Sequence, residues 1–208
     1  EQAPEMLSNA DASEGYLKSA EVRNLLNNAA SSRMYHAQCA EMLKEAVSSA
    51  VEKKDVVRIG QIGCQSATLT SSLTTALQEY ISSDRVEYVC TAPEESGLAD
   101  IQRALGENIP KISYEVYDTT TAQGLTPRSF DIVLTFDPQG QMQSKLTTLS
   151  ELVVEGGWLL LIEAVHNTGL LNVLLAGSRT QEKALSEIQW CKTLRKTGFA
   201  ELRTLTSP

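Results

Sequence analysis

Residues 57–70, VRIGQIGCQSATLT, contain the clearest candidate for a ligand-binding turn. An apolar run meets Gly63, and a polar stretch with a helix-like pattern follows it. Nucleotide-binding folds place a glycine-rich turn at this junction, because glycine lets the backbone approach the ligand and adopt unusual φ/ψ angles. Only Gly63 remains after the apolar run, where such turns usually carry two or three glycines. The pattern therefore indicates a cofactor turn that is either working or degraded.

The cysteines and histidines add little further chemistry. His36 and His166 lie far apart in sequence, so nothing supports a zinc site, and we expect no bound metal. No two cysteines stand at CxxC spacing, and all fall in apolar-patterned segments: Cys39, Cys64, Cys90 and Cys191. This usage predicts buried free thiols in a reducing compartment.

Length and charge narrow the classes of function. The 208 residues suit one domain with a helical extension, and 42% hydrophobic with 21% charged residues is ordinary for a soluble globular protein. The net charge of −8 argues against nucleic acid as a partner, because phosphates repel such a surface. No apolar run reaches the ~18 residues of a membrane span, so we expect a cytoplasmic protein. The opening residues, EQAPEML, resemble neither a natural start nor a signal peptide, which suggests a piece of a longer chain.

Strand and helix patterns alternate after a helical lead-in of residues 1–53. Short β-branched or apolar runs predict six strands: Val56–Ile62, Val86–Cys90, Ile112–Tyr117, Phe130–Phe136, residues 158–165 and Phe199–Leu205. Apolar residues three to four positions apart predict helices over residues 67–82, 94–105, 141–154 and 181–197. Gly156 and Gly157 are expected to turn the third of these helices into the fifth strand, and Gly198 to follow the last helix.

This βα order implies an α/β domain over residues 54–208, with a largely parallel sheet and helices on both faces. Ligands in such folds bind at the carboxyl ends of the strands, beside the topological switch point. The loops after the strands are therefore the places where a site is expected.

The order of segments resembles that of class I S-adenosylmethionine (SAM) methyltransferases, which have a Rossmann-like fold. Three stretches more specifically resemble the C-methyltransferase domains of polyketide synthases: QGLTPRSFDIVL (123–134), EGGWLLLIE (155–163) and SEIQWCKTLRKTGF (186–199). The lead-in SSRMYHAQCAEML resembles the segment before their first strand, so the resemblance covers roughly residues 20–205. It implies SAM as the ancestral cofactor and a carrier-protein-bound β-ketoacyl chain as the ancestral substrate.

The first motif of that family usually reads acidic-x-Gly-x-Gly-x-Gly. Here Gln61 stands at the acidic position, Gly63 is kept, and Gln65 and Ala67 replace the second and third glycines. Gln61 offers no carboxylate near the methionine ammonium group. The Gln65 side chain would project into ligand space or change the turn. Loss of the pocket is the simpler interpretation, and a new cofactor contact by Gln65 is the alternative.

The next two positions implied by the resemblance follow the second and third strands. Ala92 stands where the family carries an acidic residue that accepts both ribose hydroxyls. Glu94 or Glu95 could replace it if the loop bends back, although carboxylates in a first helical turn are usually solvated. Asp118 matches a position that often contacts the adenine edge, and a plain loop aspartate is an equal alternative.

The catalytic positions implied by the resemblance lie after the fourth and fifth strands. The histidine of the family's His–Glu dyad is replaced by Gly140, while the glutamate is kept as Glu163. A glutamate without its histidine cannot orient a base. His166 is a weak substitute, because it lies on another loop. Asp137 with the next proline resembles the start of the "(D/N)PP(Y/F)" motif of amino-group methyltransferases, but the following residues supply neither the second proline nor the aromatic.

A chain that keeps its packing pattern while losing its pocket is predicted to be non-catalytic. Such pseudo-methyltransferase domains occur in animal fatty acid synthases and some polyketide synthases, beside the ketoreductase and dehydratase domains. We therefore expect a structural domain without a cofactor, with those domains as partners and an acyl carrier protein as a further one. The alternative is an active SAM-dependent C-methyltransferase, and a third reading is a stand-alone partner protein. Only three residues follow Leu205, so we expect the family's seventh strand to be missing or an earlier segment to take its place.

Overall fold

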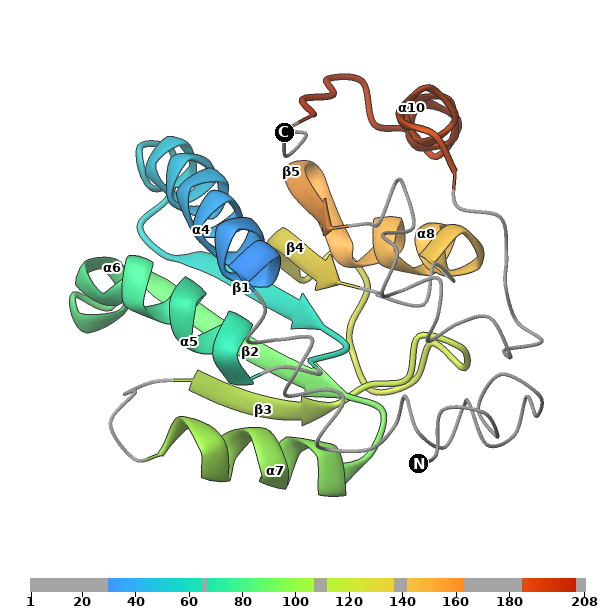
Figure 1. The fold of residues 1–208 in the computed structure, drawn as a ribbon. Coiled ribbons are helices and arrows are strands. Elements are labelled where there is room, and N and C mark those ends of the chain that lie inside the picture. Colours follow the sequence, from blue (N-terminus) through green and yellow to red (C-terminus); the bar gives the residue numbers. More distant parts are fainter. Residues whose placement is uncertain (1–29, 65–66, 107–111, 137–141, 163–184, 205–208) are drawn as a thin grey trace.

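The computed structural model describes residues 30–64, 67–106, 112–136, 142–162 and 185–204. Within them, five parallel strands form one sheet in the order β3-β2-β1-β4-β5 (Figure 1). The strands are β1 (Val57–Ile62), β2 (Val86–Ala92), β3 (Ile112–Val116), β4 (Phe130–Phe136) and β5 (Val153–Ile162). The strand order reverses at β1, so the topological switch point lies at the carboxyl ends of β1 and β4. The predicted α/β class is confirmed.

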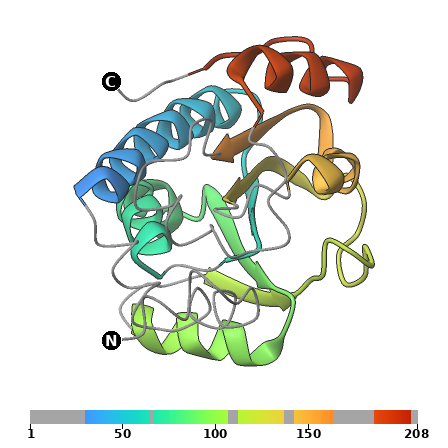
Figure 2. The same ribbon diagram turned by 45° about the vertical axis from the view of Figure 1, so that its right-hand side comes forward.

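Helices cover both faces of the sheet (Figures 1 and 2). One face carries α4 (Ala30–Val51), α5 (Ala67–Ala76), α6 (Gln78–Ser82) and α7 (Glu95–Leu105). The other face carries α8 (Met142–Leu152) and α10 (Glu187–Lys196). The helix predicted over residues 67–82 is interrupted at the buried Leu77, which separates α5 from α6.

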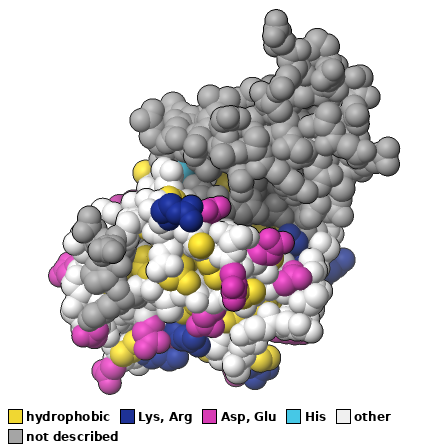
Figure 3. Space-filling view, turned by 90° about the horizontal axis from the view of Figure 1, so that it is seen from below, with side chains coloured by type: hydrophobic (Ala, Val, Ile, Leu, Met, Phe, Trp, Pro, Cys, Tyr) yellow, Lys and Arg dark blue, Asp and Glu magenta, His cyan; other side chains and the backbone are white. Residues whose placement is uncertain are grey.

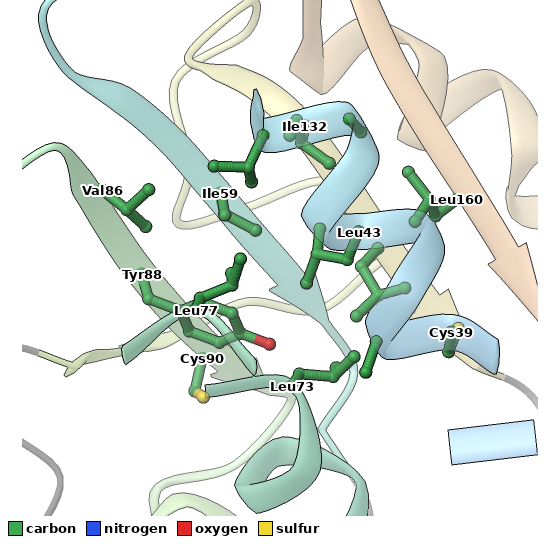
Figure 4. Packing of buried hydrophobic residues seen from close by; sticks show 14 of the residues in the cluster. Cys39, Leu43, Ile59, Leu73, Leu77, Val86, Tyr88, Cys90, Ile132 and Leu160 are labelled. Carbon is green, nitrogen blue, oxygen red and sulfur yellow. The ribbon is translucent and has the colours of Figure 1, made fainter. Parts of the chain in front are cut away.

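Two hydrophobic clusters hold these layers together. The first lies between the sheet and helices α4 to α7, and Leu43, Leu73 and Tyr88 are fully buried there (Figure 4). The second lies under α8 and α10, around Phe130 and Trp190. Burying one large apolar side chain stabilises a fold by roughly 1.5–3 kcal/mol, so both faces of the central strands contribute to stability.

At the amino-terminal ends of the strands, hydrogen bonds connect the sheet to the charged segment that follows α4. The guanidinium of Arg85 donates to the carbonyl oxygens of Val51 and Asp55 at 2.6 and 2.7 Å. The Val51 carbonyl ends α4 and has no partner within the helix, so Arg85 satisfies it from outside and also binds the segment that follows. The buried Asp131 carboxylate accepts the backbone N–H of Arg58 at 2.9 Å.

The paired glycines lie inside β5 and not before it, which corrects the predicted turn. In the pairing of β4 with β5, Phe130 lies opposite Val153, whereas Ile132 lies opposite Trp158. β5 therefore has extra residues between these two pairs, and both glycines are among them. A Cβ on Gly157 would lie 2.7 Å from the carbonyl oxygen of Asp131. Position 157 therefore requires glycine, because a side chain there would collide with the backbone of β4.

The predicted sixth strand is wrong for the residues that the structure describes. Residues 199–204, here called the C-terminal strap, are irregular and pair with no strand. Phe199 packs against the second cluster, while Arg203 forms an ion pair with Glu45 of α4 at 2.7 Å. These two contacts hold the strap outside the strand pairing that the pattern predicts.

The connection from β3 to β4, residues 117–129, contains no helix. The sheet face on that side carries a polar strip of Arg58, Glu87 and Glu115. The Arg58 guanidinium lies 3.8 Å from Glu87 and 3.4 Å from Glu115, and 4.8 Å from the centre of the Phe130 ring. This part of a parallel sheet is therefore polar, where such sheets are usually covered by helices.

Candidate functional site

The candidate site lies at the carboxyl ends of β1 and β2, beside the switch point. The structure brings Gln61, Gly63 and Ala92 together there, because the parallel register pairs Gln61 with Cys90. Two of the positions that the resemblance assigns to the cofactor therefore end neighbouring strands, and the third forms the turn after β1.

Gln61 is turned into the first hydrophobic cluster and is only 3% exposed. Its Oε1 accepts the Tyr88 hydroxyl at 2.8 Å and the Thr70 hydroxyl at 3.0 Å. Burial raises the pKa of Tyr88 well above its ordinary value, so the phenol stays a donor. Figure 4 shows Tyr88 within this cluster. The amide oxygen at the former acidic position thus holds β1, β2 and α5 together.

The turn after β1 keeps the geometry that requires glycine. Gly63 has φ +71°, and a Cβ placed on it would meet nothing within 4 Å. Its N–H, however, donates to the Thr91 hydroxyl at 3.1 Å, and the Cys64 N–H donates to the Thr91 carbonyl at 2.6 Å. Amides in such a turn are the groups that approach a bound ligand. Here two of them are bonded to β2.

Ala92 is 2% exposed, and a Cβ added to Gly97 of α7 would lie 3.5 Å from the Ala92 methyl. The end of β2 is therefore packed against α7 by a small apolar group that cannot accept a ribose hydroxyl. Glu94 and Glu95 are both exposed at the start of α7, and the Glu94 carboxylate accepts the Ser96 hydroxyl at 3.3 Å. Within the described part of the chain, no hydrogen bond or ion pair turns either carboxylate back toward Gly63.

Asp118 follows β3 at the surface, and its carboxylate is engaged locally. One oxygen accepts the backbone N–H of Thr120 at 2.8 Å, and the Thr120 hydroxyl lies 2.7 Å from both oxygens. These hydrogen bonds lower the pKa of Asp118. The aspartate therefore closes a turn of its own chain in this structure.

Several predicted positions have no structural account. Ala67 is described, as the half-buried first residue of α5. The positions that lie outside the described residues are Gln65, Asp137, Gly140, Glu163 and His166. Their roles remain predictions from the resemblance.

Sequence reasoning missed Thr91, which organises the turn more than any predicted residue. Thr91 is fully buried and contacts both Gly63 and Cys64, and its hydroxyl lies 3.3 Å from the Gln61 carbonyl oxygen. A buried threonine at the end of an apolar strand, next to a turn with a single glycine, was the available signal. Tyr88 and Thr70 could not be linked to Gln61 in this way, because they lie on a different strand and on the following helix.

The thiols near this site are free. Cys64 and Cys90 are buried, with their sulfurs 3.5 and 3.9 Å from the Gln61 carbonyl and Oε1 atoms. Cys39 is also buried, and Cys191 is half-buried. The described part of the chain contains no cluster of His, Cys, Asp or Glu side chains that could hold a metal ion.

The part of the surface that Figure 3 colours by type shows no large basic area. Acidic and basic side chains are interspersed over the part of this face that is coloured by type. Among the described helices, none is both long and apolar enough to cross a membrane.

Comparison with known proteins places the chain among methyltransferase folds. No protein-family model matches it. The hybrid PKS-NRPS synthetase thnA of Trichoderma harzianum is 34% identical over 113 residues, which are 46% of this chain and 3% of that protein. The match therefore covers a small part of a much longer polypeptide.

Three solved structures have the same fold. The DszA carbon methyltransferase superposes with a TM-score of 0.70 at 20% identity, over 86% of this chain. The CMeT domain of the citrinin polyketide synthase gives 0.63 at 16% identity, over 78% of it. The trans-methyltransferase CalH, in complex with SAH, gives 0.64 at 14% identity, over 79%.

The chain spans about half the length of these solved structures, at 50%, 46% and 51%. Together with thnA they confirm the predicted class I SAM-methyltransferase-like fold. They also confirm the resemblance to the C-methyltransferase domains of polyketide synthases.

Proposed function

We propose that the chain is a non-catalytic, C-methyltransferase-like domain with a structural role in the modifying region of a polyketide or fatty acid synthase. One observation carries this proposal. At the ends of β1 and β2, the positions that should bind SAM hold buried Gln61 and Ala92, and both side chains are taken up by contacts within the fold.

The energetics of binding support the loss of the cofactor. A micromolar ligand is held by about −8 kcal/mol. Each hydrogen bond to a charged partner contributes roughly 1.5–3 kcal/mol, and the carboxylates expected at Gln61 and Ala92 are absent. The amides of Gly63 and Cys64 would in addition have to leave Thr91. These losses together remove most of the affinity expected for SAM.

The structural role follows from what the chain retains. Both hydrophobic clusters bury the large side chains of the central strands. A folded domain without a working pocket can still set the spacing of its neighbours. We therefore propose the ketoreductase and dehydratase domains of the parent synthase as its partners, and the cytoplasm as its location.

A ligand titration tests the loss of the cofactor. We expect S-adenosylhomocysteine (SAH), raised to millimolar concentration, to release no binding heat and to leave the melting temperature unchanged, because a ligand that does not bind cannot stabilise the fold. CalH serves as the positive control under the same conditions. A rise of several degrees in melting temperature at sub-millimolar SAH would overturn the proposal.

An active C-methyltransferase is the second candidate, and the Gly63 geometry favours it. Gly63 keeps a positive φ and open space beside it, as a functional turn would require. Such an enzyme would need another base, since losing a general base costs roughly 10²–10⁴ in rate. Incubation with SAM and a β-ketoacyl carrier protein distinguishes the candidates. The active enzyme would add the mass of one methylene group to the acyl chain.

A further inference from the structure

We propose that the C-terminal strap closes the outer edge of β5 and thereby prevents a second copy of this chain from pairing with it. The proposal is independent of the proposed function, because it concerns the edge of the sheet and not the cofactor site.

The composition of β5 makes its outer edge prone to pair with a strand of another chain. Within the described residues, β5 pairs with β4 on one side and with no strand on the other. Its second half, Trp158–Ile162, reads WLLLI, an apolar run without charge, and Trp158 is 45% exposed. Edge strands of this kind are templates for pairing with another chain, and natural proteins usually block them.

The strap is anchored on both faces of the sheet. Phe199 packs into the second cluster, on the face covered by α8 and α10. Arg203 lies 2.7 Å from both carboxylate oxygens of Glu45, on α4 of the opposite face. Both α4 and α8 contact β5. Figure 2 shows the chain leaving α10 and passing above β5 toward α4. The residues between the two anchors must therefore cross the sheet edge at β5.

A second contact holds the end of the strap. The Thr204 hydroxyl donates to the Glu187 carboxylate at 2.6 Å, so the strap folds back beside the start of α10. The Arg203–Glu45 pair is exposed, and an exposed ion pair alone is a weak restraint. The strap can consequently be released without disrupting either hydrophobic cluster, provided that Phe199 stays in place.

Two variants release the strap and test the proposal. Arg203→Glu sets two carboxylates against each other, and a chain ending at Phe199 removes the rest of the strap. We expect both to take up deuterium several-fold faster in the β5 peptide, and to form dimers or larger species by light scattering as concentration rises. The peptide of β3, at the opposite edge, should be unchanged. Arg195→Glu is the matched control, because it makes the same charge change at an exposed site of α10 that has no ion pair in the described structure.

The reciprocal exchange completes the test. The double variant Glu45→Arg, Arg203→Glu restores the ion pair with reversed signs, so it should return to the uptake and size of the original chain. The proposal is overturned if the chain ending at Phe199 shows unchanged β5 uptake and no self-association. It is also overturned if the double variant behaves like Arg203→Glu, or if Arg195→Glu associates equally, since net charge would then explain the result.

Discussion

Gln61 accepts hydrogen bonds from two hydroxyls in the first hydrophobic cluster, and this arrangement fixes what a substitution there should do. Gln61→Leu keeps the apolar bulk but removes the acceptor of both Tyr88 and Thr70. Because a buried polar group that loses its partner costs about 1–3 kcal/mol, we expect a loss of about 2–4 kcal/mol in the free energy of unfolding, measured in urea. Tyr88→Phe is the control and should cost about 1 kcal/mol, because it leaves no buried donor unpaired. Equal stability of the two variants would contradict this account.

His36 is 7% exposed, and its Nδ1 has no hydrogen-bond partner among the residues that the structure describes. Burial lowers its pKa below the ordinary value of 6.5, so the folded state holds the imidazole neutral. The unfolded chain therefore binds a proton at His36 more readily than the folded chain does. The stability that the neutral imidazole contributes is fully present above pH 6.5, and it is lost as the pH falls from there through the folded pKa. When the pH is lowered from about 7.5 to about 5.5, we expect the free energy of unfolding of His36→Leu to fall by less than that of the original chain. Parallel losses in urea titrations at the two pH values would rule out this role.

At the residue scale, the sequence shows that uncharged residues stand at two positions where the resemblance implies carboxylates, but not where their side chains lie. The uncharged Gln61 and Ala92 can be recognised from residue type alone. That Gln61 turns into the core, and that Thr91 holds the Gly63 and Cys64 amides, depends on contacts between segments about thirty residues apart. Periodicity does not encode such contacts.

At the element scale, two glycines should respond oppositely to alanine. An added methyl on Gly157 would meet the Asp131 carbonyl at 2.7 Å and a Val153 methyl at 2.8 Å, so β4 and β5 would have to shift, at a cost of about 1–3 kcal/mol. The same methyl on Gly97 lies in a helix at ordinary contact distance from Ala92, and we expect a gain of about 0.4–1 kcal/mol. Urea unfolding of both variants measures the difference. A stabilised Gly157→Ala would show that β5 tolerates a side chain at its irregularity.

The strands and helices of the central fold were predictable because each has a strong local pattern. The apolar runs of β1, β2 and β4 and the helical stripes of α7 and α8 agree with the structure to within a few residues. The failures occur where tertiary contacts override the pattern. Residues 199–204 read as a strand, but Phe199 and Arg203 are held on opposite faces of the sheet. The early start of β5 depends on its pairing with Phe130, which a single segment does not reveal.

At the scale of the whole molecule, the thiols report on global unfolding. Thiolate is the reactive form, and burial raises the pKa of Cys39 to about 12. A hydrogen bond with Cys64, together with burial, also raises the pKa of Cys90. We expect iodoacetamide to modify half-buried Cys191 first, and the three buried cysteines only together as the molecule unfolds. Intact-mass spectra would contradict this if one buried thiol reacted ahead of the other two in the folded protein.

The polar strip makes β3, at one edge of the sheet, less resistant to water than the central strands. Among the described strands, β3 pairs with β2 alone and its own side chains are half-buried or exposed, whereas the side chains of the central strand β4 are buried almost throughout. In denaturant, β3 should therefore separate from the sheet first, on the Glu115 side, while β1 and β4 remain paired. Melting of this molecule should begin as fraying at one flank before the centre of the sheet gives way.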